Sequence, residues 1–277
     1  MTWLLAAATL IGAAPAHAAR AAPAHAAGAA KVSIVRLDCG TILVKDFNAF
    51  FSDSFDYKPG PRRITDSCYL VRHMNDYLLW DSGLPAALKG KTNDIGPVAA
   101  SLAQTIVEQL GQLALKPADI KFIGMSHMHF DHTGQAAAFA SAKLVIGKKD
   151  FELSKGEKDP FGPWRGAGAK VQTMDGQDVD VFGDGSVVAL NMPGHTPGHM
   201  ALLVRLASGP VLLTGDLYHS DEARAKKSIP PFNTSRADTL ASIDRFERMA
   251  KNLGAKVIIQ HEPADIAKLP AFPKAAE

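Results

Sequence analysis

From residue 32 onward, short apolar runs alternate along the chain with polar connections rich in glycine and proline. Residues 32–37 alternate apolar and polar side chains and predict a first strand, which residues 41–44 continue. Residues 68–71 and 77–80 predict two paired strands joined by a turn. Further apolar runs predict buried strands at 120–125, 187–190, 211–213 and 257–259.

Three other segments have the pattern or composition of helices. Residues 97–110 have apolar side chains four positions apart and a proline suited to the first helical turn. Residues 134–143 are alanine-rich, and Thr234 and Ser235 cap a helix that ends at Gly254. Two β-rich halves with helices outside them form an αββα sandwich, and we predict this α/β fold for the chain.

Four metal-binding side chains lie close together in residues 126–132, which have the sequence SHMHFDH. His127 and His129 alternate, so an extended backbone directs both to the same side. Asp131 and His132 follow where the chain turns from a strand towards the alanine-rich segment, in the kind of loop where α/β proteins carry functional residues. Imidazole and carboxylate are ligands for zinc, and imidazole also binds iron, copper and nickel.

Three more candidate ligands occur later in the chain. His195, Asp216 and His261 each come at the end of an apolar run. A histidine-rich surface loop would not be accompanied by this repeated pattern. Strand ends that each supply one metal-binding residue indicate a site assembled at the edge of a sheet.

With these residues in this order, the chain resembles the metallo-β-lactamase superfamily, and within it the N-acyl-homoserine lactone hydrolases. The resemblance extends from about residue 32 to about residue 262. Beside the ligand motifs, it rests on segments 68–71, 78–85, 195–199 and 210–216.

The resemblance implies the αββα fold and two metal ions, which we expect to be zinc, with other divalent transition metals as the alternative. By correspondence, the first ion is held by His127, His129 and His195, the second by Asp131, His132 and His261, and Asp216 bridges them. A hydroxide shared by the two ions would attack the lactone carbonyl, and Asp131 would reprotonate the leaving alkoxide. The substrate would be a small acyl lactone. In the family, the residue corresponding to Asp81 lies beneath the metals, and we expect His199 to bond the ligand loop.

This sequence departs from the family at the third residue after the bridging aspartate. Lactone hydrolases have a tyrosine three residues after it, whereas here Tyr218 lies at plus two and His219 at plus three. Either could donate a hydrogen bond to the substrate, or both could only pack beside the site.

Two loops are candidates for the wall of an apolar substrate pocket. Residues 46–62 and 151–170 are rich in aromatic residues, and the candidate side chains are Phe50, Phe51, Phe161 and Trp164. The alternative is that these aromatic side chains pack onto the domain or lie in an exposed connection.

Other functions remain open on the same scaffold. A β-lactamase fits less well because those enzymes generally lack the bridging carboxylate. A glyoxalase II-like thioesterase and a phosphotriesterase are further alternatives, and a metal-binding module without catalysis is less consistent with a full ligand set. No Gly-x-Ser-x-Gly motif is present, which disfavours serine hydrolase chemistry of that type.

The first thirty residues differ in composition from the rest. The apolar run at 3–11 and the small residues Ala16 and Ala18 predict a signal peptide at 1–18, with cleavage as late as residue 26 because APAHAA occurs at 14–19 and 22–27. The run is too short to span a membrane, and no basic residue precedes it. We expect a flexible alanine-rich segment at 19–31, a hydrolase domain at 32–277, and a periplasmic or secreted protein. A disordered leader in a cytoplasmic protein is the alternative.

Charge and cysteine content limit the possible partners. The chain has 30 Lys and Arg against 28 Asp and Glu, a formal net charge of +2, which gives no reason to expect nucleic acid or an anionic membrane as partner. A homodimer is one partner that we leave open, because the sequence does not give the oligomeric state. Cys39 and Cys68 are the only cysteines. Export would permit a disulfide between them, but we favour two buried free thiols.

Overall fold

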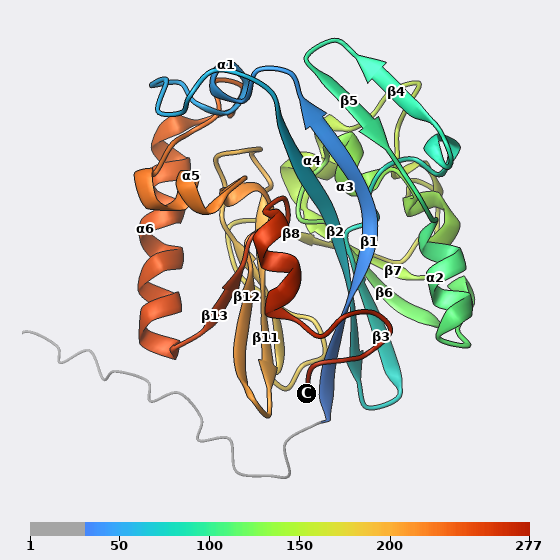
Figure 1. Cartoon of the computed structure of the whole chain (residues 1–277). Coiled ribbons are helices and arrows are strands. Elements are labelled where there is room, and N and C mark those ends of the chain that lie inside the picture. The colour runs from blue at the N-terminus through green and yellow to red at the C-terminus, as the bar shows by residue number, and fades with distance from the viewer. Residues whose placement is uncertain (1–30) are drawn as a thin grey trace, which may run out of the picture.

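The structure, a computed structural model, describes residues 31–277. It has two β-sheets packed face to face with helices on both outer faces (Figure 1). The predicted αββα sandwich is therefore confirmed. The predicted signal peptide and nearly all of the flexible segment after it lie outside the described residues.

The first sheet has the strand order β4-β5-β1-β2-β3-β6-β7-β8. Its strands are β1 (Val32–Val44), β2 (Arg62–His73), β3 (Asp76–Trp80), β4 (Thr92–Ile95), β5 (Val98–Ser101), β6 (Ile120–Gly124), β7 (Lys143–Gly147) and β8 (Val171–Met174).

The second sheet has the order β13-β12-β11-β10-β9. Its strands are β9 (Val179–Asp180), β10 (Val187–Asn191), β11 (Met200–Leu206), β12 (Gly209–Leu213) and β13 (Lys256–Ile258).

The helices are short except for the last. The α-helices are α1 (Phe47–Phe51), α2 (Ile106–Gln112), α3 (Phe130–Thr133), α4 (Lys148–Leu153), α5 (Asp221–Lys226) and α6 (Arg236–Leu253). The 3₁₀ turns are η1 (Ala86–Leu88), η2 (Pro117–Asp119), η3 (Ala136–Phe139), η4 (Gly162–Trp164), η5 (Gly215–Leu217) and η6 (Pro263–Lys268). No helix within residues 31–277 is long and apolar enough to cross a membrane.

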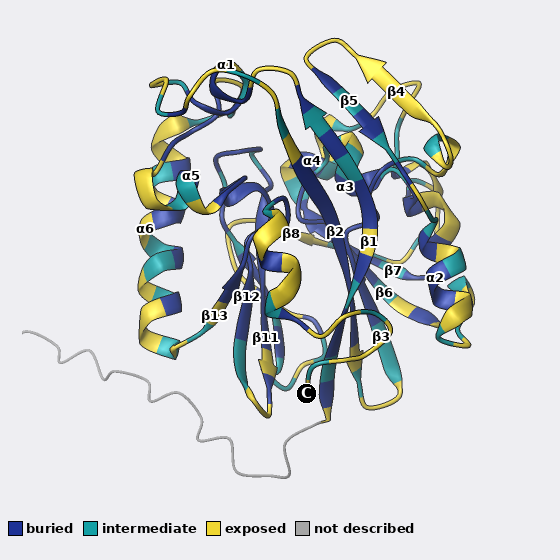
Figure 2. Ribbon diagram, viewed as in Figure 1, coloured by how far each residue is buried: buried dark blue, intermediate teal, exposed yellow. Residues whose placement is uncertain are grey.

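Three apolar clusters hold the layers together. Between the sheets, Trp80, Val187 and Leu202 belong to one buried cluster. On the outer side of the second sheet, Ile243 and Phe246 of α6 pack in another, so that the inner side of this helix is buried and its outer side exposed (Figure 2). A third cluster packs α2 against the outer side of the first sheet.

Local patterns predicted several elements correctly. β2 and β3 pair antiparallel, with Tyr69 opposite Trp80, as the two apolar runs indicated. α6 begins after Ser235, whose side chain accepts a hydrogen bond from the backbone N–H of Asp238, and ends at Gly254 in the left-handed conformation.

The helix predicted at residues 97–110 is correct only from Ile106 onward. Residues 98–101 form strand β5, which pairs with the end of β1, and the helix begins only at Ile106. A spacing of four residues satisfies the alternation of a strand as well as a helical repeat, so Val98 and Ala100 point inward from a strand.

The helix predicted at residues 134–143 is wrong. The segment forms only the turn η3 before Lys143 begins β7, because its first residues are held by other parts of the chain. The backbone N–H of Gly134 donates to the carbonyl of Gly83, and the side chain of Gln135 bonds the N–H of Ile106 and the carbonyl of Leu84.

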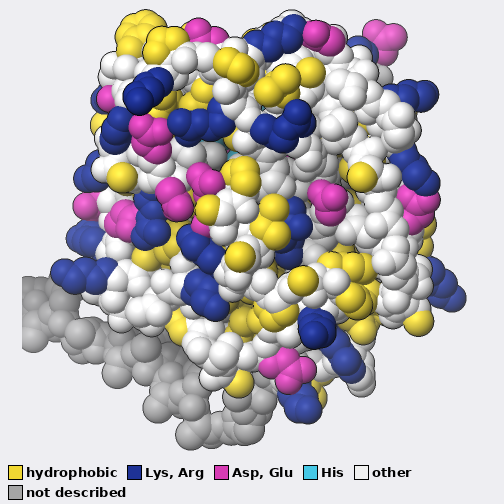
Figure 3. All heavy atoms as spheres, in the orientation of Figure 1, with side chains coloured by type: hydrophobic (Ala, Val, Ile, Leu, Met, Phe, Trp, Pro, Cys, Tyr) yellow, Lys and Arg dark blue, Asp and Glu magenta, His cyan; other side chains and the backbone are white. Residues whose placement is uncertain are grey.

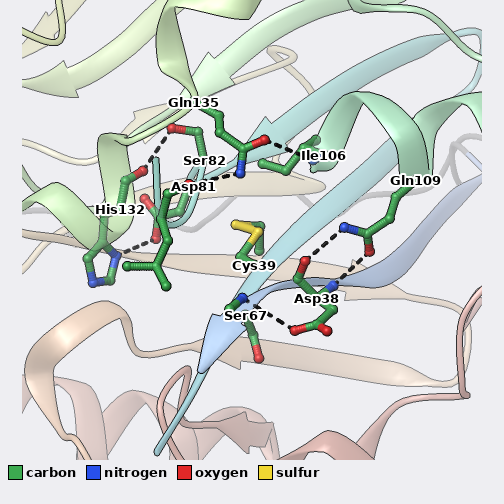
Figure 4. Close-up of a disulfide and its surroundings, with 12 residues drawn as sticks. Asp38, Cys39, Ser67, Asp81, Ser82, Ile106, Gln109, His132 and Gln135 are labelled. Atoms are coloured by element: carbon green, nitrogen blue, oxygen red, sulfur yellow. Dashed lines mark hydrogen bonds and ion pairs between the residues drawn. A yellow bond between two sulfur atoms is a disulfide. The ribbon is translucent and has the colours of Figure 1, made fainter. Parts of the chain in front are cut away.

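The expectation of two free thiols is corrected as well. Cys39 and Cys68 form a disulfide between β1 and β2, with their Cα atoms 5.8 Å apart (Figure 4). The strand register shifts between Asp38 and Gly40, and this bulge brings Cys39 beside Cys68. A bulge of this kind cannot be recognised from alternating polarity.

Candidate metal centre

The segment after β6 carries four of the seven predicted ligands, with His127 and His129 in the loop and Asp131 and His132 in α3. In this loop, Ser126 is fixed from two sides: its N–H donates to Asp81 Oδ1 at 2.6 Å, and its carbonyl accepts from the N–H of Met200 at 2.7 Å. The strand end thus places His127 and His129 next to the second sheet.

His127, His129 and His195 form a first group around a common point. His129 Nδ1 lies 2.9 Å from His127 Nε2 and 3.0 Å from His195 Nε2. Burial lowers the pKa of His127 and of His195 well below the usual value for histidine. These two imidazoles are therefore neutral, which is the form that binds a metal ion.

Asp131, His132 and His261 form a second group. The Nε2 atoms of His132 and His261 are 3.3 Å apart, and Asp131 Oδ2 lies 3.9 Å and 3.8 Å from them. Burial opposes protonation of the two imidazoles, but the nearby Asp216 carboxylate raises the pKa of His132 well above its usual value and that of His261 to about 9. A cation held by this group would replace those protons.

Asp216 lies between the two groups, on the turn η5 that follows β12. Its Oδ2 atom is 3.6 Å from His127 Nε2 and 3.4 Å from His195 Nε2. Its Oδ1 atom is 3.1 Å from His132 Nε2 and 3.0 Å from His261 Nε2. One carboxylate oxygen therefore faces each group, which is the arrangement of a bridging ligand.

The arrangement of the seven side chains in the structure is suited to two metal ions. Within each group the ligand atoms lie within 4.8 Å of one another, and Asp216 belongs to the first group as well as facing the second. Asp216 Oδ1 is buried and, although two imidazole nitrogens are close, it accepts no hydrogen bond of normal geometry. Imidazole nitrogen and carboxylate oxygen atoms that converge on common points are the ligand set that zinc and related ions prefer.

Residues around the ligands fix their orientation. Asp81 Oδ2 lies 3.1 Å from His132 Nδ1, so the same carboxylate holds both His132 and Ser126 (Figure 4). His199 Nδ1 donates to the Met192 carbonyl, and its Nε2 accepts from the N–H of Asp216 at 2.9 Å. Asp81 and His199 thus contact the ligands from outside the two groups.

Sequence reasoning missed two residues that orient ligands. His195 Nδ1 donates to Asn233 Oδ1 at 2.9 Å, and His261 Nδ1 donates to the Thr65 carbonyl at 2.8 Å. Each bond leaves the Nε2 atom of the histidine free to bind a metal ion. Neither partner belongs to a motif, because the contacts span 38 and 196 positions of the chain.

An apolar cavity of about 220 Å³ opens over the ligands. Phe50, Phe51 and Phe232 form part of its wall, and the ring centroids of Phe50 and Phe232 are 5.0 Å apart. The remaining lining residues are Ile42, Val44, Ile64, Val98, His129, Phe130, Asp131, Asp216, His219 and His261. Phe50 and Phe51 therefore line the cavity, and Phe232 is a wall residue that the sequence did not single out.

Phe161 and Trp164 are placed elsewhere, which corrects the expectation that they line the pocket. Both are buried in the cluster on the outer side of the first sheet. Trp164 Nε1 donates to the carbonyl of Ala142, which satisfies its polar atom inside this core. Aromatic residues in a loop of irregular structure are compatible with either location, and packing decides between them.

Tyr218 and His219 point in opposite directions. The Tyr218 hydroxyl donates to Glu247 of α6 at 2.9 Å, and its ring packs near Phe246, away from the ligands. His219 Nε2 lies 3.0 Å from Asp216 Oδ2, and its ring lies 4.2 Å from that of Phe51. Of the two candidates, His219 borders the cavity.

A larger cavity, of about 700 Å³, lies on the other side of the His195 loop. Its lining includes Lys149, Glu152, Asp175 and Asp238. No cluster of metal-binding side chains among the described residues lies there. The candidate site is therefore the smaller cavity.

Comparison with known proteins agrees with the fold. The chain is 35% identical over 188 residues to the N-acyl homoserine lactonase AttM of Rhizobium radiobacter, covering 61% of this chain and 69% of that protein. An N-acyl homoserine lactone hydrolase solved with the product N-hexanoyl-L-homoserine has a TM-score of 0.75 at 22% identity, covering 89% of this chain and 99% of that one. AidC, a dizinc quorum-quenching lactonase, has a TM-score of 0.62 at 17% identity, covering 89% and 90%. The model of the metallo-beta-lactamase superfamily matches residues 63–261, and the chain belongs to this superfamily.

Proposed function

We propose that the protein opens the ring of N-acyl homoserine lactones at a centre of two zinc ions. The observation that carries the proposal is the position of Asp216, whose two oxygens face two separate ligand groups on the floor of an apolar cavity. The lactonase relatives, one of them a dizinc enzyme, support the choice of substrate and of metal.

The first ion would be held by His127, His129 and His195, the second by Asp131, His132 and His261, and Asp216 would bridge them. Two zinc ions held in this way would supply a hydroxide nucleophile at neutral pH and polarise the lactone carbonyl.

The protein's own residues would orient the substrate and move protons. The apolar wall, with Phe50 and Phe232, would take the acyl chain, so that the ring lies over the ligands. His219, which lines the cavity beside Asp216, would donate to the carbonyl oxygen of the substrate. Asp131, which lines the cavity, would accept the proton released from the attacking water and return it to the ring oxygen as the ester bond breaks.

Hydrolysis of acyl homoserine lactones by zinc-loaded protein tests this proposal. We expect the ring-opened acid, identified by mass, together with two zinc ions per chain by elemental analysis. Asp216→Asn should abolish most of the activity because it removes the bridging charge, whereas Asp244→Asn, on the exposed side of α6, should change nothing.

Rapid cleavage of a β-lactam, a thioester or a phosphotriester without any lactone opening would assign the site to that substrate class. Zinc binding without activity on any of the four would point to a metal-binding role.

We also propose that the protein is exported to the periplasm or beyond. The apolar run at 3–11 and the small residues Ala16 and Ala18 support export, and so does the Cys39–Cys68 disulfide, because disulfides persist in oxidising compartments. N-terminal sequencing of protein from its native host should find a start near residue 19 or residue 27. A mature protein that begins at Met1 would contradict export by this route.

A further inference from the structure

The side chain of Asp150 joins the two loops that carry the first group of ligands. Asp150 lies in α4, directly after β7, and is fully buried. Its Oδ2 atom accepts hydrogen bonds from the N–H of Met128 at 3.1 Å and from the Thr196 hydroxyl at 2.6 Å. Its Oδ1 atom accepts from the N–H of Gly198 at 2.6 Å.

These three donors belong to the segments that hold the metal-binding histidines. Met128 lies between His127 and His129, and Thr196 follows His195. Asp150 therefore connects all three histidines of the first group through residues next to them.

The backbone around Asp150 is packed closely, which restricts how the His195 loop can lie against α4. A Cβ atom at Gly147 would collide with the backbone of Gly198, and a Cβ atom at Gly198 would lie 2.7 Å from Asp150 Oδ1. The start of α4 thus lies directly against the His195 loop. A buried carboxylate is stable there because three donors satisfy it.

The second group is supported by a different carboxylate. Asp81 bonds His132 and the N–H of Ser126, at the start of the motif loop. No hydrogen bond joins Asp150 to Asp131, His132 or His261 among the described residues. Asp150 therefore supports only the first group, whereas Asp81 bonds His132 of the second group directly and reaches the first group only through Ser126.

We propose that Asp150 is a positioning residue that holds His127, His129 and His195 at the spacing required by the first metal ion, so that its loss weakens that ion selectively. The inference rests on the proposed two-metal centre and adds to it a residue that determines how tightly one of the two ions is bound. Residues that orient metal ligands typically change metal affinity by about 10- to 100-fold when they are replaced.

The decisive variant is Asp150→Asn, which keeps the shape of the side chain but turns one acceptor oxygen into an NH₂ group that faces donors. We expect zinc titration by calorimetry to show one ion weakened by about 10- to 100-fold and the other unchanged. Anomalous diffraction from zinc-loaded crystals should show the lost occupancy at the position beside His127, His129 and His195. Thr196→Val, which removes one of the three bonds, should weaken the same ion less.

A matched control and a rescue separate positioning from simple misfolding. Asp175→Asn alters an exposed carboxylate that pairs with Lys148, which lies in α4 together with Asp150. This variant should leave both zinc affinities unchanged. In Asp150→Asn, excess zinc should restore most of the lactone-opening rate, which a globally damaged fold would not allow. Thermal unfolding of the metal-free variants gives a second check on folding.

Equal weakening of both ions, or loss of the ion beside His132 and His261, would overturn the inference. Unchanged zinc binding in Asp150→Asn would also overturn it. A wild-type protein that binds two ions but opens no lactone would overturn only the proposed activity. A wild-type protein that does not bind two ions would overturn both.

Discussion

At the scale of single residues, Tyr218 and His219 differ in the direction of their side chains and therefore in the role that we assign to each. Both follow the bridging Asp216 closely, but only His219 faces the cavity, while Tyr218 is bonded to Glu247. Burial, followed by the charge of Glu247, raises the pKa of Tyr218, so this phenol stays protonated at neutral pH.

The first prediction compares these neighbours. His219→Phe keeps a ring beside Phe51 but removes the nitrogen donor, and kcat for lactone opening should fall by about 10²-fold. Tyr218→Phe should leave kcat unchanged and lower the free energy of unfolding by about 1 kcal/mol, because only the bond to Glu247 is lost. Steady-state kinetics and urea unfolding measure both effects. A larger loss of kcat in Tyr218→Phe than in His219→Phe would reverse the assignment.

Asp66 is a buried carboxylate of β2 for which neither oxygen has a hydrogen-bond partner. Burial raises its pKa well above the usual value, against the opposing effect of His261 and His132. Above pH 3.8, the ordinary pKa of the group, the unfolded chain therefore loses a proton that the folded protein retains. Stability must fall as the pH rises through this range.

The second prediction follows from this loss of stability with rising pH. Asp66→Asn cannot ionise, so at pH 7 the metal-free variant should be more stable than the wild type, by about 1–3 kcal/mol. The difference should shrink towards zero below about pH 4, where Asp66 is protonated in both states. Urea unfolding of metal-free protein between these pH values measures it. A variant that is less stable at pH 7 would show that the carboxylate has a stabilising partner.

At the scale of elements, the Cys39–Cys68 bond fastens β1 to β2 beneath the site. Figure 4 shows it between the Asp38–Gln109 contact, which docks α2, and the Asp81–His132 contact. Both sulfur-bearing side chains are fully buried. The bond therefore stabilises the strand pair on which the Asp81 turn rests.

The third prediction concerns this bond. Replacing both cysteines by alanine should lower the free energy of unfolding by about 3–4 kcal/mol, because the disulfide closes a loop of 29 positions. Guanidinium unfolding of the wild type and the double variant gives the difference, and the wild type unfolded in the presence of reductant should approach the variant. Equal stability of oxidised wild type and variant would contradict the prediction.

At the scale of the whole molecule, the cavity depends on both halves of the chain. Ile42 and Phe50 come from the N-terminal half, and Phe232 and His261 from the C-terminal half. On the face seen in Figure 3, positive and negative side chains are interspersed, in agreement with the near-neutral net charge. The apolar part of the cavity wall suits an apolar acyl chain.

The fourth prediction concerns the acyl chain. Catalytic efficiency should rise with chain length, by about 0.8 kcal/mol in transition-state stabilisation for each methylene buried, and then level off when the cavity is full. Phe50→Ala should flatten this rise more than it lowers the rate on a short-chain lactone. Phe55→Ala, in the same loop but 72% exposed, is the control and should leave the profile unchanged. Equal efficiency at every chain length would exclude the cavity as the acyl site.

The sequence by itself determined the elements and residues whose signals are local. Alternation predicted β1, β2 and β3, and the cap at Ser235 with Gly254 predicted α6. It also determined which seven side chains could bind metal, because each stands in a short motif or at the end of an apolar run. These signals involve residues a few positions apart, where the periodicity of the backbone is sufficient.

Only the tertiary structure decided features that join distant parts of the chain. These include the two faces of Asp216, the orientation of His195 by Asn233, the Asp150 link between ligand loops, and Phe232 in the cavity wall. Tertiary contacts also decided against the first part of the predicted helix at 97–110 and against the predicted helix at 134–143, since a four-residue spacing fits a strand and the alanine-rich segment is held at Gly134 and Gln135. In each case the deciding energy comes from packing and hydrogen bonds between segments far apart in sequence, which no local pattern encodes.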